Sequence, residues 1–366
     1  HLLQSNFAPL QLLLPIGISF YTFQAISYTV DVYKERFPKT TGLLEYTFYL
    51  TFFPLLIAGP ITRAKILIPQ IDAPQPNNKQ LINTGLWLII CGLLKKALVA
   101  DYLAQYNNWI FADPLAYTGF ENLMGVLGFT LQIYCDFSGY SDMAIGIAAL
   151  MGFQLPNNFN SPYQSLNLTE FWHRWHITLS QWFRDYVYIP LGGNRKGELK
   201  TYRNTFITMI VAGLWHGASG MFVLWGILHG IGLTIHKFFQ NRGFSKVHNT
   251  IYVKAICWTI TFTYISVAWV FFRSQDLSTA FSIIGKITTD LHFVDVQNFI
   301  NTRLLWIMLL AVSLELHSIR QSDYKWLQQK FISLPWLAKL MIFLLVLQLV
   351  INFSQNSVQP FIYTRF

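Results

Sequence analysis

Apolar segments and short polar loops alternate along the whole chain. Nine to ten apolar segments are candidates for membrane helices, near residues 12–32, 44–58, 81–102, 123–135, 143–153, 205–218, 221–238, 252–272, 304–316 and 337–353. A helix crosses a bilayer with about 20 residues. Several segments are shorter or contain Gly and Pro, so we expect some tilted, broken or re-entrant helices. The pattern predicts an all-α, polytopic integral membrane protein.

The composition agrees with a membrane protein. Charged residues make up 12% of the sequence and the mean hydropathy is +0.37, whereas a soluble domain carries roughly 25% charged residues. The net charge of +9 comes from Lys and Arg in short runs between apolar segments, which argues against nucleic-acid binding. No repeat, low-complexity tract or long linker divides the sequence, so we expect one membrane-embedded domain over residues 1–366.

The three cysteines, Cys91, Cys135 and Cys257, are widely separated and lie in or beside apolar segments without a CxxC pair. Cysteines in this setting are typically small buried hydrophobes. The sequence therefore predicts neither a disulfide framework nor a cysteine metal site.

The positions of Lys and Arg predict the orientation in the membrane, because cytoplasmic loops carry an excess of these residues. Three clusters of Lys and Arg lie in the loops. If each of the last four apolar segments crosses the membrane once, the three clusters are on the same side, which we expect to be cytoplasmic. The turn at Ser219, residues 275–301 and residues 359–366 then face outward. The clusters contain Arg184, Arg195, Lys196, Lys200, Arg203, Lys237, Arg242, Lys246, Lys254, Arg320, Lys325, Lys330 and Lys339.

His216 lies in a long region of the sequence that contains no charged residue. Between Arg203 and Lys237 there are 33 residues without Lys, Arg, Asp or Glu. An ionisable side chain inside such a region is unfavourable unless it faces a cavity or a partner. We therefore interpret His216 as a functional residue in the protein interior.

A second informative segment begins at Asn167. Asn167 and Glu170 have the spacing of a capping box, which predicts the start of a helix. If the helix that starts there continues without a break, its residues form an aromatic stripe and a separate polar stripe. A helix with these two stripes lies at the membrane interface or in a wet cavity. A plain aromatic anchor with solvated histidines is an equally good interpretation. The stripes are Trp175, Leu179, Trp182 and Tyr186, and His173, His176, Ser180 and Arg184.

Metal and serine-hydrolase chemistry have weaker support. His173 and His176 could hold a metal together with His216, but no HExxH motif is present. Ser219 is not in a GxSxG nucleophile elbow, which requires a strand, turn and helix. We expect no metal site and no serine nucleophile.

Two further pairs of polar residues lie in apolar surroundings. Asp136 and Asp142 separate two apolar runs, where they either line a polar cavity or cap broken helix ends. His229 and His236 follow in the next apolar segment, and we expect them to be satisfied in a helix–helix contact.

Six motifs along the sequence occur together: Trp-His-Gly at 215–217, Phe-Trp-His-Arg-Trp-His at 171–176, and the segments 15–23, 52–63, 134–140 and 361–363. Together they resemble the membrane-bound O-acyltransferase family and, within it, the bacterial alginate O-acetylation branch. The resemblance runs from about Leu14 to the C-terminus. Members normally begin with further membrane helices, so we expect such helices to precede this sequence.

The resemblance implies a bundle of helices with re-entrant or interfacial helices around a central funnel or tunnel. It implies that His216 and His176 are catalytic, whereas His173 inherits no role. In this branch the acyl donor is expected to be cytoplasmic acetyl-CoA, with no permanently bound cofactor. The expected acceptor is an exported polysaccharide, the expected partner is a periplasmic SGNH-type acetyltransferase, and the expected location is the bacterial inner membrane.

The chemistry of these residues fits acyl transfer. A thioester is already activated, so the protein must supply a base for the attacking hydroxyl, and we assign this role to His216. His176 could orient the hydroxyl or the carbonyl, or hold the developing oxyanion. We expect cavity-lining roles for Asp136, Ser138, Trp215, Ser180 and Arg184. CoA phosphates could meet Arg195, Lys196 and Lys200, which are equally well explained as ordinary cytoplasmic loop residues.

A transporter or proton-coupled flippase is the alternative, in which intramembrane His and Asp relay protons. Inverted repeats would favour it, and the sequence shows none. The acceptor stays open among alginate, cellulose, another exopolysaccharide, peptidoglycan and a partner-protein side chain.

Overall fold

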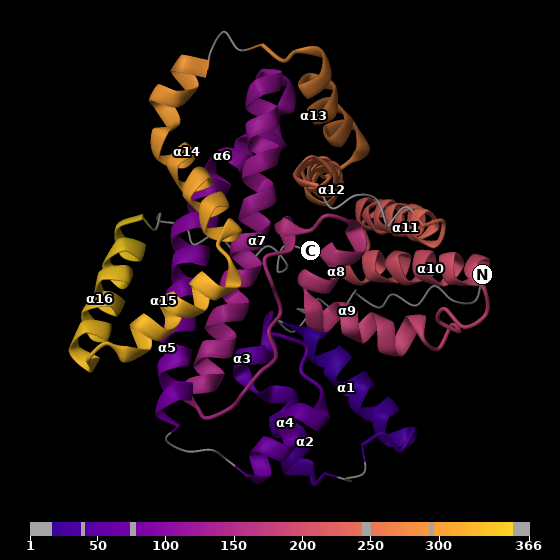
Figure 1. Cartoon of the computed structure of the whole chain (residues 1–366), viewed down its shortest axis with the longest axis vertical. Coiled ribbons are helices and arrows are strands. Elements are labelled where there is room, and N and C mark those ends of the chain that lie inside the picture. The colour runs from indigo at the N-terminus through magenta and orange to yellow at the C-terminus, as the bar shows by residue number, and fades with distance from the viewer. Residues whose placement is uncertain (1–16, 38–40, 74–77, 244–249, 293–295, 354–366) are drawn as a thin grey trace, which may run out of the picture.

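The computed structural model describes residues 17–37, 41–73, 78–243, 250–292 and 296–353, which form helices joined by turns (Figure 1). This confirms the predicted all-α class. The helices are α1 (Ile18–Tyr33), α2 (Leu43–Thr51), α3 (Phe53–Leu56), α4 (Ala64–Asp72), α5 (Lys79–Leu93), α6 (Asp101–Ala112), α7 (Gly119–Leu150), α8 (Leu168–Arg174), α9 (Ile177–Phe183), α10 (Glu198–His216), α11 (Gly220–Asn241), α12 (Ile251–Arg273), α13 (Leu277–Thr289), α14 (Val296–Ser318), α15 (Gln321–Ser333) and α16 (Trp336–Phe353). Short π or 3-10 segments are η1 (Leu94–Ala100), η2 (Pro114–Ala116), η3 (Pro162–Gln164) and η4 (Arg184–Tyr188).

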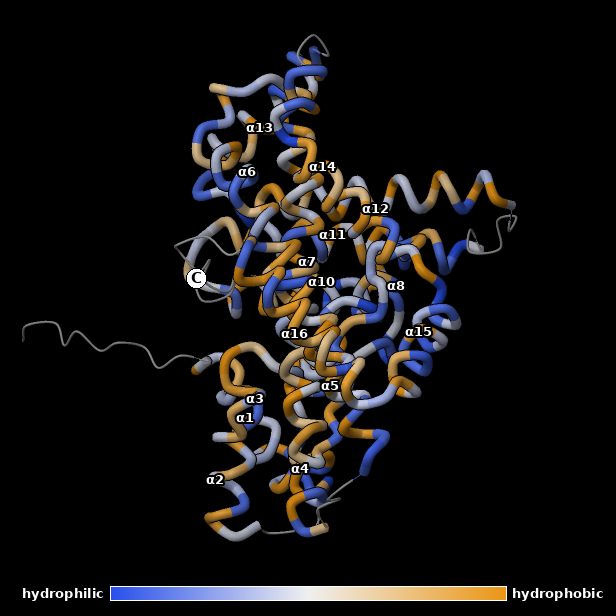
Figure 2. Tube along the Cα trace, turned by 90° about the vertical axis from the view of Figure 1, so that its left-hand side faces the viewer, coloured by the Kyte–Doolittle hydropathy of each residue, from blue (hydrophilic) through white to orange (hydrophobic). Residues whose placement is uncertain are grey.

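Four of the described helices are long and apolar enough to cross a bilayer, namely α11, α12, α14 and α16. Only 11% of the best apolar window of α16 and 22% of that of α14 are buried inside the protein. The exposed apolar side chains of these two helices suit contact with lipid. Figure 2, which colours the chain by the hydropathy of each residue, shows much of α16 in orange, the colour of hydrophobic residues. Some of the other expected segments are shorter or interrupted. Residues 44–58, for example, divide into the short helices α2 and α3.

The long helix α7 corrects one prediction. Residues 123–135 and 143–153 were expected to be separate segments, yet residues 119–150 form one helix that Thr118 caps by accepting from the Glu121 N–H. The two carboxylates do not break it, because lysines of the neighbouring η1 pair with them: Lys95 with Asp142 at 2.5 Å and Lys96 with Asp136 at 2.6 Å. The charges are thus neutralised along the helix and not at its end.

Glycines let α5 approach α7 closely. A Cβ on Gly85 would lie 2.7 Å from the Gly146 carbonyl oxygen, and one on Gly92 would lie 2.6 Å from that of Gly139. No larger side chain could occupy these positions without moving the backbone. Figure 1 shows α7 running along the long axis of the molecule, whereas α10 and α11 lie side by side across it.

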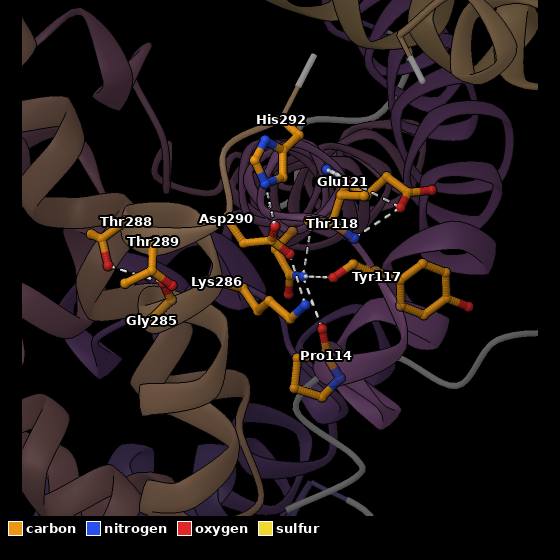
Figure 3. Close-up of polar contacts among 11 residues, drawn as sticks. Pro114, Tyr117, Thr118, Glu121, Gly285, Lys286, Thr288, Thr289, Asp290 and His292 are labelled. Carbon is orange, nitrogen blue, oxygen red and sulfur yellow. Dashed lines mark hydrogen bonds and ion pairs between the residues drawn. The ribbon is translucent and has the colours of Figure 1, made fainter. Parts of the chain in front are cut away.

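The N-terminus of α7 is held by α13. The Gly119 N–H donates to the carbonyl oxygen of Asp290 at 2.9 Å. The carboxylate of Asp290 pairs with Lys286 Nζ at 2.8 Å and with His292 Nε2 at 3.0 Å (Figure 3). Since Asp290 directly follows α13, this cluster fixes that helix to the start of α7.

Candidate active site

His216 is the last residue of α10, and its imidazole is 7% exposed. Its ring centroid lies 4.8 Å from that of Trp215, 4.9 Å from Trp225 and 5.0 Å from Phe272. The turn to α11 follows directly, and Ser219 caps that helix by accepting from the Met221 N–H at 3.2 Å. The structure therefore places His216 at the junction of two helices, inside an aromatic environment.

The segment after Asn167 differs from its prediction in one important way. Asn167 caps α8 as expected, because its side chain accepts from the Glu170 N–H at 2.8 Å. However, α8 ends at Arg174, and His176 has a left-handed backbone (φ 41°, ψ 54°) before α9 begins. The Ile177 N–H donates to the carbonyl oxygen of Asn158 at 2.9 Å instead of continuing α8.

Because of this break, the predicted polar stripe does not form on one face. His176 is 1% exposed, whereas His173 lies on the exposed side of α8. Ser180 donates to the Trp175 carbonyl oxygen at 3.3 Å. Arg184, 59% exposed, pairs with Asp185.

The rings of His176 and His216 both lie near the ring of Trp215. The ring centroids of His176 and Trp215 are 6.3 Å apart. Phe137 meets the His176 ring edge to face at 4.6 Å, and Phe20 and Phe159 each lie 6.5 Å away. Two histidines separated in sequence are thus brought to one buried aromatic cluster, which we call the histidine site.

The other predicted lining residues have different neighbours. Ser138 is fully buried on α7, next to Phe137 of the histidine site. Asp136, also on α7, pairs with Lys96 on η1. Trp215 is the predicted lining residue that contacts both histidines.

The expected CoA-binding residues lie far along α10 from His216. Arg195, Lys196 and Lys200 are exposed at the N-terminal end of this 19-residue helix. A helix of that length spans about 27 Å. These residues and His216 are therefore at opposite ends of one rigid element.

A nearer cationic cluster joins Arg184, which was predicted to line the cavity, to Arg63, to which the sequence analysis gave no role. Arg63, 8% exposed, pairs with Asp185 at 3.1 Å and lies over the Tyr186 ring at 4.3 Å. The same carboxylate accepts from Arg184 Nε at 2.9 Å. Since α9 connects His176 to Arg184, the cluster lies about 12 Å along that helix from His176.

Two partly buried lysines, Lys95 and Lys96, were also missed. Lys96 pairs with both Asp136 and Asp101, and the side chain of Asp136 is only 2% exposed. Two adjacent lysines in an apolar stretch were a usable signal. Their partners could not be identified, because Asp136 and Asp142 lie about 40 residues further along the sequence.

The histidines of α11 have the contacts that were expected. His229 accepts from Trp172 Nε1 at 3.3 Å, and His236 Nδ1 lies 2.9 Å from the Thr169 hydroxyl, so both contact α8. His317 on α14, which was not predicted, accepts from the Tyr163 N–H at 3.0 Å. No group of three or more potential metal ligands converges within the described ranges, so His173, His176 and His216 do not form one.

Comparison with known proteins places this site in a family. Residues 31–273 match the family model described as MBOAT, membrane-bound O-acyltransferase family. The peptidoglycan O-acetyltransferase of Helicobacter pylori is 40% identical over 309 residues, covering 77% of this chain and 58% of that protein. The probable alginate O-acetylase AlgI of Pseudomonas aeruginosa is 45% identical over 269 residues, covering 74% of this chain and 50% of that protein.

A more distant relative is the teichoic acid D-alanyltransferase of Bacillus subtilis, which is 26% identical over 286 residues, 74% of this chain and 72% of that protein. The chain spans about half the length of the first two relatives. The matched region contains both histidines together with Trp215, Phe137 and Phe159. The chain belongs to the membrane-bound O-acyltransferase family.

Proposed function

We propose that the protein is an O-acyltransferase of the bacterial inner membrane. It moves an acetyl group from cytoplasmic acetyl-CoA across the membrane for O-acetylation of an exported, alginate-like polysaccharide. A periplasmic SGNH-type acetyltransferase completes the transfer. The single observation that carries this proposal is the burial of His216 and His176 around Trp215, within the region shared with the family.

The proposed reaction uses His216 as the base. The hydroxyl oxygen of the acceptor attacks the thioester carbonyl, the C–O bond forms and the C–S bond breaks. The hydroxyl proton passes to the imidazole and then to the leaving thiolate, so the imidazole is regenerated. Aromatic rings around His216 exclude water, which protects the thioester from hydrolysis.

The proposed direction of transfer rests on the arrangement of α10 and α11. The Asn241 side chain, at the end of α11, donates to the Tyr202 hydroxyl near the start of α10 at 3.4 Å. The Arg195–Lys200 cluster and Arg242 are therefore at the same end of this helix pair. Cytoplasmic loops are rich in Lys and Arg, so we assign this end to the cytoplasm and the donor entry to the same side.

The acceptor class follows from the names of the relatives. Two of them are named for O-acetylation of peptidoglycan or alginate, and a third for transfer of D-alanine to teichoic acid. These are carbohydrate or polyol polymers outside the cytoplasm. A hydroxyl-bearing exported polymer is therefore the acceptor that we propose.

The test is a transfer assay with the full-length protein and its partner in lipid nanodiscs. Acetyl-CoA is supplied, and both free CoA and acetylated polymer are measured. The proposal predicts CoA release that depends on the acceptor and is lost in His216→Gln. Absence of acceptor-dependent CoA release from a well-folded wild-type protein would contradict the proposal.

Proton-coupled transport is the second candidate, and the partly buried pairs of Lys95 with Asp142 and of Lys96 with Asp136 favour it. A transporter would move solute along a proton gradient without consuming acetyl-CoA. Gradient-driven uptake in proteoliposomes, with no CoA released, would support this candidate over acyl transfer.

A further inference from the structure

Asn158 holds His176 through its side-chain oxygen. Asn158 is 1% exposed, and its Oδ1 lies 3.1 Å from His176 Nδ1. The same oxygen accepts from the Thr178 N–H at 3.3 Å and from the Thr178 hydroxyl at 2.9 Å. The Asn158 Nδ2 donates to the Ser141 hydroxyl of α7 at 3.3 Å. The amide is therefore fixed from both sides.

The backbone N–H of Thr178 determines which way this amide points. A backbone N–H can only donate, so the Asn158 atom that it meets must be the oxygen. An amide oxygen can only accept, so His176 Nδ1 must donate to it. The neutral imidazole then carries its proton on Nδ1, and Nε2 presents a lone pair.

This lone pair is buried. Among the residues that the structure describes, His176 Nε2 has no hydrogen-bond partner. Four aromatic rings lie near the imidazole: Phe20 of α1, Phe137 of α7, Phe159 in the loop that follows α7, and Trp215 of α10. The titratable group that acts on the imidazole electrostatically is His216. A buried acceptor without a partner is unfavourable unless a ligand satisfies it.

Two other buried histidines have the opposite arrangement. Trp172 Nε1, which can only donate, occupies His229 Nδ1, so the neutral ring carries its proton on Nε2. The Tyr163 N–H occupies His317 Nε2, so that ring carries its proton on Nδ1. Both rings offer an N–H on the remaining nitrogen, whereas His176 offers a lone pair.

The backbone of His176 supports a functional position. Its φ of 41° is a left-handed conformation that is uncommon for a residue with a side chain. The structure maintains it through the hydrogen bond from Ile177 to Asn158 and the hydrogen bond from Asn160 to Arg174, both 2.9 Å. Unfavourable backbone conformations held in this way are concentrated at functional sites.

We propose that Asn158 is a positioning residue that fixes the His176 tautomer, so that His176 Nε2 accepts the hydrogen bond of the incoming acceptor hydroxyl. This inference rests on the proposed acyl transfer. The O–H group binds to His176 Nε2 before the reaction and then turns its proton toward His216. As the oxygen attacks the thioester carbon and the C–S bond breaks, His216 takes the proton and passes it to the leaving thiolate. Neutral His176 has no free N–H for a carbonyl oxygen or an oxyanion, which leaves the hydroxyl as its ligand.

The tautomer can be measured without any reaction. We would record nitrogen-15 NMR spectra of the full-length protein labelled at histidine, and assign His176 by difference with His176→Gln. The neutral ring should show a protonated Nδ1 and an unprotonated Nε2. In Asn158→Leu, this signal should be replaced by a mixture of tautomers. A protonated Nε2 in the neutral wild-type ring would overturn the inference.

The second test uses the transfer assay across pH. Asn158→Leu should lower kcat by roughly 10²-fold, since loss of the orienting partner leaves His176 in a tautomer that cannot accept the hydrogen bond of the hydroxyl. Asn158→Asp keeps an acceptor oxygen and should retain most of kcat at high pH, while its carboxylate stabilises the imidazolium and moves the acidic limb of the kcat profile to higher pH. Ser141→Ala removes the hydrogen bond to Asn158 Nδ2 but leaves the Asn158 oxygen and its bonds to Thr178 in place, so it should lower kcat much less than Asn158→Leu.

The two proposals fail in different ways. If the wild type transfers acetyl groups but Asn158→Leu has normal kcat, or if Asn158→Asp shows an unshifted acidic limb, the positioning role is wrong and the acyltransferase proposal stands. If the folded wild type transfers nothing, the acyltransferase proposal is wrong, whereas the NMR result still decides the tautomer.

Discussion

Gly213 of α10 and Gly226 of α11 face each other with no side chain between the two backbones. A Cβ on either glycine would lie 3.3 Å from the Cα of the other. In addition, a Cβ on Gly226 would overlap the Met209 carbonyl, and one on Gly213 would overlap that of Phe222. This close approach sets the position of His216, which follows Gly213 by less than one helical turn.

Gly226→Ala is therefore expected to push α10 away from α11. Overpacking of this kind typically destabilises by about 1–3 kcal/mol, so the thermal midpoint should fall and acetyl transfer should fall with it. Gly220→Ala is the matched control, because a Cβ there meets nothing within 4 Å. Equal thermal midpoints for the two variants would show that the helix contact is looser than the structure indicates.

The pair of Lys96 and Asp136 gives a second prediction. Lys96→Met leaves a carboxylate that is 2% exposed without its cation, which should lower the stability by about 3–5 kcal/mol. The double variant Lys96→Met with Asp136→Leu should recover a large part of this loss. Lys65→Met on the exposed side of α4 is the control. The thermal unfolding midpoints of the three variants in detergent measure these effects. A midpoint of Lys96→Met equal to that of Lys65→Met would refute the expectation.

The contact between α13 and α7 predicts a pH dependence. The hydrogen bond from Lys286 lowers the pKa of Asp290 below its ordinary value. A carboxyl with a lowered pKa stabilises the folded state above the pKa of the unfolded chain, near pH 4, and loses this contribution as the pH falls further. Asp290→Asn should thus be less stable than the wild type at neutral pH, and the gap should close in acid. A gap that widens on acidification would contradict this sign.

The orientation is tested by cysteine labelling in intact cells. In a variant without the native cysteines, Lys200→Cys should resist an impermeant thiol reagent until the cells are opened, whereas Thr288→Cys on α13 should react at once. These sites lie on opposite sides of the proposed topology. The reverse pattern would overturn the cytoplasmic entry of the donor.

Local signals in the sequence were sufficient for several features. The apolar segments and their lengths predicted the all-α class. The cap at Asn167 was confirmed, and it could be predicted because it depends on residues only three positions apart. His216 stood out because no charged residue surrounds it in sequence. The orientation remains a prediction, and residues 359–366, which were expected outside, lie beyond the described residues.

Features that depend on distant partners could not be predicted in this way. The end of α8 is imposed by the segment around Asn158, whose backbone takes the hydrogen bond that the helix would have needed. The continuity of α7 depends on Lys95 and Lys96, which neutralise carboxylates that looked like helix ends. The role of Asn158 depends on a hydrogen bond across 18 residues of sequence.

The most direct test of the account is acetyl transfer by His216→Gln. Glutamine keeps the size and hydrogen bonding of histidine but cannot accept a proton, and general base catalysis is worth roughly 10²- to 10⁴-fold. We expect a loss of that order for His216→Gln and His216→Ala at normal expression and membrane insertion. His176→Ala should lose as much or somewhat less, and the exposed His173→Ala should remain near the wild type. If His216→Gln acetylates polymer at a near-normal rate, His216 is a packing residue and the proposed mechanism is wrong.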